Sequence, residues 1–191
     1  MLSRREFVTR SAASACACAY AAKAAAEAIL TDDGLHKQPW FLESFLELAD
    51  DLAGAAEKHR RLVIAWELRG CPACRRMHQV NLAKPEIESY IRQHFDILQL
   101  NIIGSRKVTD FDGAEISEKA LAAKYGVRFT PTIQFFPESG TRLGERAPEK
   151  REVARAPGYL RPDDFLALFR FVREKGYETK SFREYLRATR P

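Results

Sequence analysis

Short apolar runs alternate with helical patterns along the middle of this chain. Residues 62–66 are a continuous apolar run, and residues 95–103, FDILQLNII, are mostly apolar; both contain Val, Ile or Leu. Runs of this length with β-branched residues are typical of buried strands. Two further strands are predicted at residues 132–136, with Pro131 at the entry where a missing N–H is tolerated, and at residues 151–156.

Apolar residues at helical spacing predict the helices between these strands. The first is expected within residues 35–59, where Phe41, Phe45, Leu48 and Leu52 recur every three to four positions and are assigned to the core. Capping residues, prolines and glycines place the other helices, namely 72–83, a second piece from Pro85, 117–125 before Gly126, 162–176, and a short one after Ser181. The polar residues 104–113 are read as a surface excursion with a turn at Asp112-Gly113.

The first 26 residues have the pattern of an export signal. The twin-arginine run SRREF is followed by SAASACACAYAA, a small-residue stretch too short to span a bilayer, and by an alanine cleavage motif at 24–26. We therefore expect residues 1–26 to be removed on export to the bacterial periplasm, residues 27–176 to form one domain, and residues 177–191 a C-terminal helical extension. An alanine-rich helix at a cytoplasmic N-terminus is the alternative.

Removal of this segment changes the charge and the cysteine count. The formal net charge falls from +5 to +2, because residues 1–26 carry four basic side chains and one acidic one, and this is too little for a nucleic-acid binder. Cys16 and Cys18 leave as well, so Cys71 and Cys74 are the two that remain. An exported protein with one C-x-x-C pair points to redox chemistry rather than to a disulfide framework. We expect it to act as a monomer.

The run Cys-Pro-Ala-Cys begins a predicted helix directly after the first strand. Pro72 suits the first helical turn, so Cys71 is expected at the helix N-terminus, where free N–H groups favour a thiolate and lower its pKa from about 8.5 towards 3.5 to 7.5. Arg75 and its neighbour Arg76 add positive charge. Cys74 lies on the same helical face, one turn deeper, so one sulfur is expected to attack and the other to resolve.

Other uses of a C-x-x-C pair remain open. Zinc binding would need four ligands, and Cys71, Cys74, His78 and His94 make a candidate set. Haem attachment is nearly excluded, because Arg75 stands where a histidine would follow the second cysteine. A structural disulfide would close only a short loop and therefore contribute little stability.

The order of these elements over residues 35–176 resembles the thioredoxin fold, an α/β fold with a central mixed sheet flanked by helices. The runs LAAKYGVRFTPTIQFF and EVARAPGYLRPDDFLALFRFV look like those of exported thioredoxin-like proteins of the SoxW type, which are associated with sulfur oxidation. The resemblance implies that Pro131 is cis and lies against the dithiol, and that the backbone of Thr130 pairs with an extended substrate. It also implies that Cys71 is the attacking thiolate and Cys74 the resolving one, with no cofactor beyond their redox-active disulfide.

The chain departs from the cytosolic thioredoxin pattern at three places. Gly70 replaces the usual Trp before the first cysteine, and Ala65 replaces the buried Asp six residues before it. Glu67 shares strand parity with Ala65 and is a candidate proton acceptor, with a solvated strand-end carboxylate as the other interpretation. The intervening Pro72-Ala73 matches neither cytosolic reductases nor strong periplasmic oxidants, so it leaves the direction of electron flow open.

These observations predict a periplasmic thiol–disulfide oxidoreductase. We expect a reductase of protein disulfides or of cysteine-linked sulfur adducts on a sulfur-oxidation carrier protein, recharged by a membrane electron-donor protein. A disulfide-donating oxidase or isomerase is the alternative, and a zinc-binding module that uses Cys71, Cys74 and His78 is a third.

Overall fold

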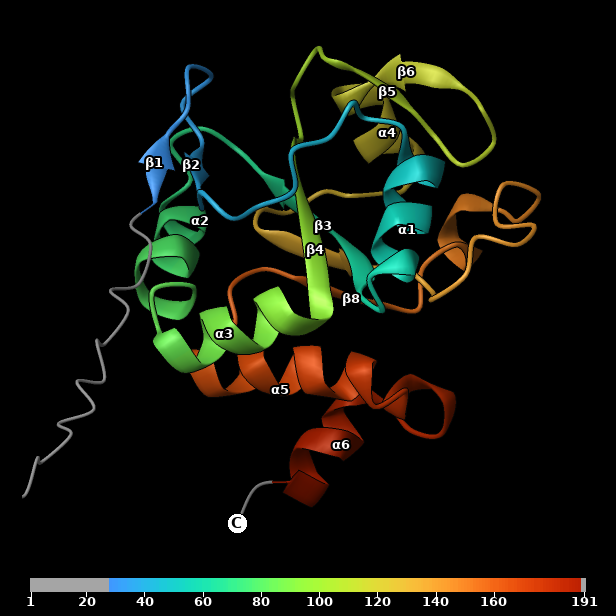
Figure 1. Cartoon of the computed structure of the whole chain (residues 1–191). Coiled ribbons are helices and arrows are strands. Elements are labelled where there is room, and N and C mark those ends of the chain that lie inside the picture. The colour runs from blue at the N-terminus through green and yellow to red at the C-terminus, as the bar shows by residue number, and fades with distance from the viewer. Residues whose placement is uncertain (1–27, 190–191) are drawn as a thin grey trace, which may run out of the picture.

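Strand β3 (Arg61–Glu67) is the central strand of a four-stranded sheet in the computed structural model, which describes residues 28–189. It pairs in parallel with β4 (Phe95–Asn101) on one side and antiparallel with β7 (Thr132–Phe135) on the other. The last strand, β8 (Ala154–Pro157), adds antiparallel to β7. The sheet is therefore mixed, in the order β4-β3-β7-β8, and Figure 1 labels its strands β3, β4 and β8.

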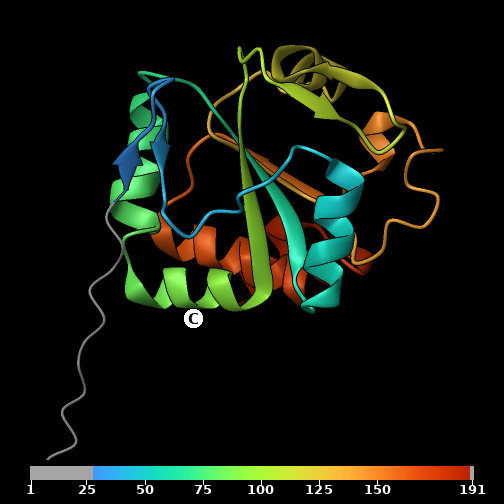
Figure 2. The ribbon, with the colours of Figure 1, turned by 45° about the horizontal axis from the view of Figure 1, so that its top comes forward.

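Helices cover both faces of this sheet. The side chains of β3 alternate between two apolar clusters, because successive residues of a strand point to opposite faces. One cluster packs the sheet against α3 (Pro85–His94) and α5 (Pro162–Arg173), and the other against α1 (Leu48–Glu57) and α4 (Glu118–Lys124). Figures 1 and 2 show α3 and α5 side by side, away from α1.

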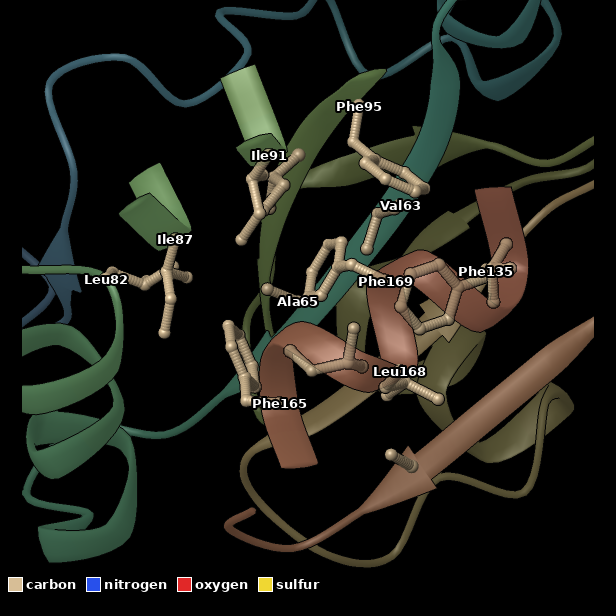
Figure 3. Close-up of a cluster of buried hydrophobic side chains, with 14 of the residues drawn as sticks. Val63, Ala65, Leu82, Ile87, Ile91, Phe95, Phe135, Phe165, Leu168 and Phe169 are labelled. Carbon is tan, nitrogen blue, oxygen red and sulfur yellow. The ribbon is translucent and has the colours of Figure 1, made fainter. Parts of the chain in front are cut away.

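Aromatic side chains fill the core on the α3 and α5 side. Phe169 lies between Phe95 and Phe135, with ring centroids 4.9 and 5.0 Å apart and the rings nearly perpendicular, which is a favourable edge-to-face arrangement. Figure 3 shows these three rings in one cluster with Val63 and Ala65 of β3. This core anchors the strand whose C-terminal end leads to the cysteine pair.

The predicted thioredoxin-like α/β fold is confirmed, and so are most of its elements. The strands at 62–66 and 95–103 are present as β3 and β4, and Pro131 directly precedes β7. Ser117 caps α4 by accepting a hydrogen bond from the Ala120 N–H, and Gly126 ends this segment with a φ of 63°. The last strand begins at Ala154, three residues later than predicted.

The prediction of a helix over much of residues 35–59 is wrong in its first half. Helix α1 begins only at Leu48, because Leu46 has a φ of 66° and its carbonyl accepts a hydrogen bond from the Thr109 N–H. Phe41 is buried within this irregular stretch. Phe45, which the periodicity assigned to the core, is 98% exposed.

Two small hairpins flank the main sheet. Strands β1 (Ile29–Leu30) and β2 (His36–Lys37) form one that the sequence pattern did not predict. Strands β5 (Lys107–Thr109) and β6 (Glu115–Ser117) form the other, and its turn uses Gly113 with a φ of 79°. The polar excursion at residues 104–113 is thus one arm of a hairpin and its turn.

The C-terminal segment packs onto the domain. Helix α6 (Phe182–Thr189) starts at the predicted capping box, in which the Glu184 carboxylate accepts from the backbone N–H of Ser181 at 2.7 Å. Tyr185 is buried against Phe171 of α5 with ring centroids 5.3 Å apart. The helix therefore contributes to the core. Two 3₁₀ turns, Pro148–Lys150 and Gly176–Glu178, complete this half of the chain.

The expected signal segment, residues 1–26, lies outside the described residues. Within residues 28–189 no helix is both long and apolar enough to cross a bilayer.

Candidate active site

The chain turns sharply between β3 and the helix that carries the cysteines. Leu68 accepts a hydrogen bond from the Cys71 N–H at 3.2 Å, and Gly70 has a φ of 71°, a conformation that side chains other than glycine rarely adopt. Pro72 then occupies the first position of α2 (Pro72–Arg76), where no intrahelical partner for its nitrogen is needed. Cys71 is thus the N-cap residue, as predicted. The helix continues through a π-helical turn at Met77–Asn81.

Cys71 and Cys74 form a disulfide across the first turn of α2, with Cα atoms 5.3 Å apart. The backbone N–H of Cys74 donates to the Cys71 sulfur at 3.1 Å. The two sulfurs differ in access, because Cys74 is 2% exposed whereas Cys71 is only partly buried. An incoming group can therefore reach Cys71 and not Cys74.

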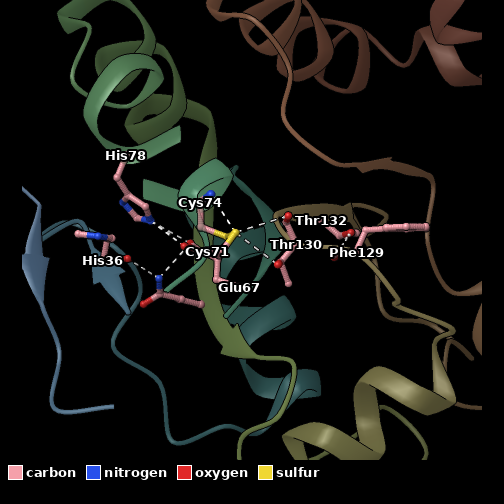
Figure 4. Close-up of a disulfide and its surroundings, with 9 residues drawn as sticks. His36, Glu67, Cys71, Cys74, His78, Phe129, Thr130 and Thr132 are labelled. Atoms are coloured by element: carbon pink, nitrogen blue, oxygen red, sulfur yellow. Dashed lines mark hydrogen bonds and ion pairs between the residues drawn. A yellow bond between two sulfur atoms is a disulfide. The ribbon is translucent and has the colours of Figure 1, made fainter. Parts of the chain in front are cut away.

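The loop before β7 lies directly against the outer sulfur. The Thr130-Pro131 peptide bond is cis. The Thr130 hydroxyl donates to the Cys71 sulfur at 3.4 Å, and the Thr130 carbonyl oxygen lies 3.6 Å from the same atom. Figure 4 shows Thr130 facing the disulfide while the ring of Phe129 points away from it.

This loop is held in place by hydrogen bonds on both sides of the cis bond. The Thr132 hydroxyl donates to the Phe129 carbonyl at 2.7 Å, and the Gly158 N–H donates to the Pro131 carbonyl at 2.7 Å. The backbone N–H of Thr130 donates no hydrogen bond to any residue in the described part of the chain. An edge of backbone is therefore open beside Cys71.

Glu67, at the end of β3, is fully buried, so the interpretation as a solvated strand-end carboxylate is wrong. Its two carboxylate oxygens lie 2.9 and 3.0 Å from Nε2 of His78, which is buried as well. The Gln99 side-chain N–H donates to the same carboxylate at 3.0 Å. Figure 4 shows Glu67 and His78 of this group beside the cysteine pair.

Sequence reasoning missed the place of His78 and Gln99 in this buried polar group. His78 follows Cys71 by seven residues, so helical spacing puts it on the cysteine face, and that signal was read only as a zinc ligand. In the structure its Nε2 faces Glu67, and its Nδ1 lies 3.5 Å from the side-chain nitrogen of Gln38. Among the described residues no group of three or more His, Cys, Asp or Glu side chains is placed to hold a metal ion. The arrangement thus offers no support for the zinc module.

The remaining predicted site residues lie on the outer side of the helix. Pro72 and Arg75 are exposed next to the disulfide. Arg76 is exposed too, and its guanidinium stacks over the ring of Tyr159 with 5.0 Å to the centroid. Tyr159 follows Gly158 in the loop after β8, so this contact joins α2 to that loop.

Known proteins resemble this chain over most of the domain that carries the cysteine pair. The family model of the thioredoxin-like domain matches residues 48–173. A thioredoxin-fold protein from Helicobacter pylori superposes with a TM-score of 0.54 at 21% identity, covering 73% of this chain and 96% of its own. A thioredoxin from Thermus thermophilus superposes with a TM-score of 0.50 at 24% identity, covering 66% and 84%.

No curated protein matches the chain significantly. The two structural neighbours share the fold, and the family model spans more than half of the sequence. The chain therefore belongs to the thioredoxin-like domain family, and its fold with the Cys71–Cys74 pair is that of a thiol–disulfide oxidoreductase.

Proposed function

We propose that this protein is an exported thiol–disulfide reductase that acts through Cys71 and Cys74. One observation carries the proposal: the partly exposed Cys71 sulfur receives two hydrogen bonds, from the Cys74 N–H and the Thr130 hydroxyl, at 3.1 and 3.4 Å. In the reduced protein these donors stabilise a thiolate at Cys71, and the thiolate is the nucleophilic form of cysteine.

The reaction follows from the different access of the two sulfurs. The Cys71 thiolate attacks one sulfur of a client disulfide, the client S–S bond breaks, and a mixed disulfide forms while the second client sulfur leaves as a thiolate. Cys74 then attacks Cys71, which releases the first client sulfur and closes the Cys71–Cys74 disulfide. Two electrons pass to the client, and a dithiol donor must supply two electrons for the next cycle.

Glu67 and His78 are proposed to accept the proton of Cys74 when it attacks. Cys74 must lose its proton in a position that solvent scarcely reaches. The usual Asp is absent because Ala65 occupies its position, whereas the Glu67–His78 pair lies on the same face of β3 and is buried. This supports the assignment of Glu67 as a supporting residue, with His78 added to it.

Thr130 and Pro131 are proposed to bind the client. The free N–H of Thr130 lies on a fixed loop beside the attacked sulfur, so an extended client segment can pair with it as an added strand. This pairing would hold the client sulfur in line with Cys71.

The pathway rests on the sequence resemblance alone. The twin-arginine pattern supports export to the periplasm, and the resemblance to the SoxW type favours a client disulfide or cysteine-linked sulfur adduct on a sulfur-oxidation carrier protein. An oxidising compartment requires a membrane electron-donor protein for recharging.

Reduction of insulin by the mature protein with dithiothreitol tests the activity. We expect faster precipitation of the insulin B chain than with dithiothreitol alone, loss of this acceleration in Cys71→Ser, and a client trapped as a mixed disulfide in Cys74→Ser. Equal turbidity rates for the wild type and Cys71→Ser would reject the proposal.

The reduction potential separates a reductase from the alternative oxidase or isomerase. Equilibration with glutathione gives this potential, and a value near about −270 mV supports the reductase. A value near about −120 mV would assign the protein as an oxidase instead.

A further inference from the structure

The chain segments that carry and contact the cysteine pair bear charge of one sign. Three segments adjoin Cys71 or one another, namely residues 70–80, residues 126–132, whose Thr130 carbonyl lies 3.6 Å from the Cys71 sulfur, and residues 156–162, whose Tyr159 stacks with Arg76. None of them contains Asp or Glu. Their exposed charged side chains are all arginines, namely Arg75, Arg76, Arg128 and Arg161.

Most of these arginines lack a carboxylate partner in the described part of the chain. Arg161 is 3.7 Å from Asp164 and is therefore partly compensated. Arg75 and Arg128 have no ion pair among residues 28–189, and Arg76 contacts only the Tyr159 ring. We call Arg75, Arg76 and Arg128 the arginine rim.

The nearest acidic side chains do not cancel this charge. Glu67 is buried and faces His78, and Glu152 forms an ion pair with Arg155 at 2.8 Å. Asp32 and Asp33 line a cleft together with Arg69, which is left out of the rim for this reason, and Asp33 accepts hydrogen bonds from Thr31 and Asn101.

The rim is close enough to act on a bound client. Arg75 follows Cys74 directly, and Arg128 lies two residues before Thr130, whose carbonyl oxygen is 3.6 Å from the Cys71 sulfur. Two residues span at most about 7 Å of chain, so Arg128 lies on the same short loop that contacts the Cys71 sulfur. Charges are screened over a Debye length of about 8 Å at physiological ionic strength, so the rim acts on client residues that lie next to Arg75 or Arg128 and not on distant ones.

An aromatic side chain lies within the same surface. Phe129 is 65% exposed, although its carbonyl is fixed by the Thr132 hydroxyl and the loop around it is held by Gly158. An exposed aromatic ring on a rigid loop beside a reactive sulfur is suited to contact an apolar client side chain.

We infer that the client of this protein is an acidic polypeptide segment that carries Asp or Glu next to its reactive disulfide and an apolar residue for Phe129. The inference rests on the proposed reductase function and narrows its substrate class. Charge complementarity with the arginine rim speeds the encounter and disfavours basic clients.

The test uses two disulfide-closed peptides of equal length that differ only in flanking residues, Glu in one and Lys in the other. Fully reduced wild-type protein is mixed with each peptide in a single turnover, and peptide thiols are quantified after acid quenching. We expect the acidic peptide to react at least about tenfold faster, with a ratio that shrinks as salt is added.

Reversing the charge of one arginine tests whether the rim causes the difference between the two peptide rates. Arg128→Glu should reduce or invert the acidic-to-basic rate ratio. Arg183→Glu, an equal change of charge on exposed α6, should leave the ratio unchanged. Phe129→Ser should lower both rates without changing their ratio, because it removes an apolar contact and no charge.

Three results would overturn the inference. Equal rates for the two peptides, or equal ratios in Arg128→Glu and Arg183→Glu, would show that the rim does not select clients. Reduction of dithiodiglycolate, a small anionic disulfide, as fast as the acidic peptide would show that no polypeptide is recognised. If the wild type reduces neither these peptides nor insulin, the proposed function itself fails, which is a different outcome from reduction without preference.

Discussion

His78 and Glu67 face each other beside the cysteine pair, with Nε2 of His78 2.9 Å from the nearer carboxylate oxygen and both side chains buried. Each is the main polar partner of the other, since Gln99 adds only one further hydrogen bond to the carboxylate. A buried polar group without a hydrogen-bond partner destabilises the folded state, and the contact with His78 offsets this cost for Glu67.

Loss of the His78 side chain should lower the stability of the domain more than loss of the Glu67 charge. His78→Ala leaves a buried carboxyl group without its main partner and is expected to lower the free energy of unfolding by about 3 to 5 kcal/mol. Glu67→Gln keeps the size and an acceptor oxygen for Gln99, so its loss should be smaller. Urea unfolding measures both, and a larger loss in Glu67→Gln would contradict the pairing described here.

The same pair should affect the second step of the reaction. Glu67→Gln removes the proposed proton acceptor for Cys74, so we expect slower release of the client from the mixed disulfide and a shift of the pH profile of that step to higher pH. Rapid-quench kinetics with a peptide disulfide separates release from the first attack. An unchanged pH profile would restrict Glu67 to a structural role.

Two phenylalanines of the irregular stretch before α1 should respond oppositely to truncation. Phe41 is 3% exposed, so Phe41→Ala is expected to cost about 3 to 5 kcal/mol of stability. Phe45 is 98% exposed, so Phe45→Ala should change stability by less than about 0.5 kcal/mol. Similar losses of stability in both variants would indicate that Phe45 is buried, as the helix predicted from the sequence pattern requires.

Arg151 connects the long loop after β7 to the β5–β6 hairpin through ion pairs. Its guanidinium donates to Asp110 at 2.7 Å and to Asp112 at 2.9 Å, and Asp110 is fully buried. These contacts hold the pKa of Asp112 well below its ordinary value, since hydrogen bonds from Lys124 and Arg151 outweigh the opposing effect of burial. A lowered carboxyl pKa contributes stability that is present above about pH 4 and is lost as the pH falls further.

Arg151→Met is therefore expected to destabilise the domain by about 1.5 to 3 kcal/mol at neutral pH, because Asp110 loses a charged hydrogen-bond donor while its ion pair with Lys124 remains. The double variant Arg151→Met, Asp110→Asn should recover part of this loss. Thermal unfolding of the two variants and the wild type measures the recovery, and a double variant less stable than Arg151→Met would exclude the lost contact of the Asp110 carboxylate as the cause.

Tyr185 should make the protein sensitive to alkaline pH. Burial and the hydrogen bond to Glu174 raise the pKa of Tyr185 to about 12. A raised tyrosine pKa favours the protonated folded state, so its contribution is complete below about pH 10 and is lost as the pH rises towards 12.

The control is Tyr185→Phe, which cannot ionise. Between pH 10 and 12 its stability should fall less steeply than that of the wild type, by up to about 1.4 kcal/mol per pH unit. Urea unfolding across this range gives the slopes, and equal slopes would show that Tyr185 does not titrate there.

The sequence by itself determined the features that depend on neighbours along the chain. The apolar runs of β3 and β4, the Pro72 helix start, the Ser117 cap and the Ser181–Glu184 capping box are local patterns, and each is present in the structure. The spacing of Cys71 and Cys74 likewise fixed which sulfur would be exposed, because a helix turn places the second one deeper.

Only the tertiary structure decided the environment of these residues. Phe45 has the spacing of a helical core residue but lies before the helix. Helix α1 begins only at Leu48, and the Leu46 carbonyl instead accepts a hydrogen bond from Thr109, more than sixty residues later in the chain. Glu67 became buried because His78 and Gln99 reach it from a helix and a neighbouring strand. The arginine rim likewise gathers side chains from distant segments. Local periodicity carries no information about such partners, which meet only when the chain is packed.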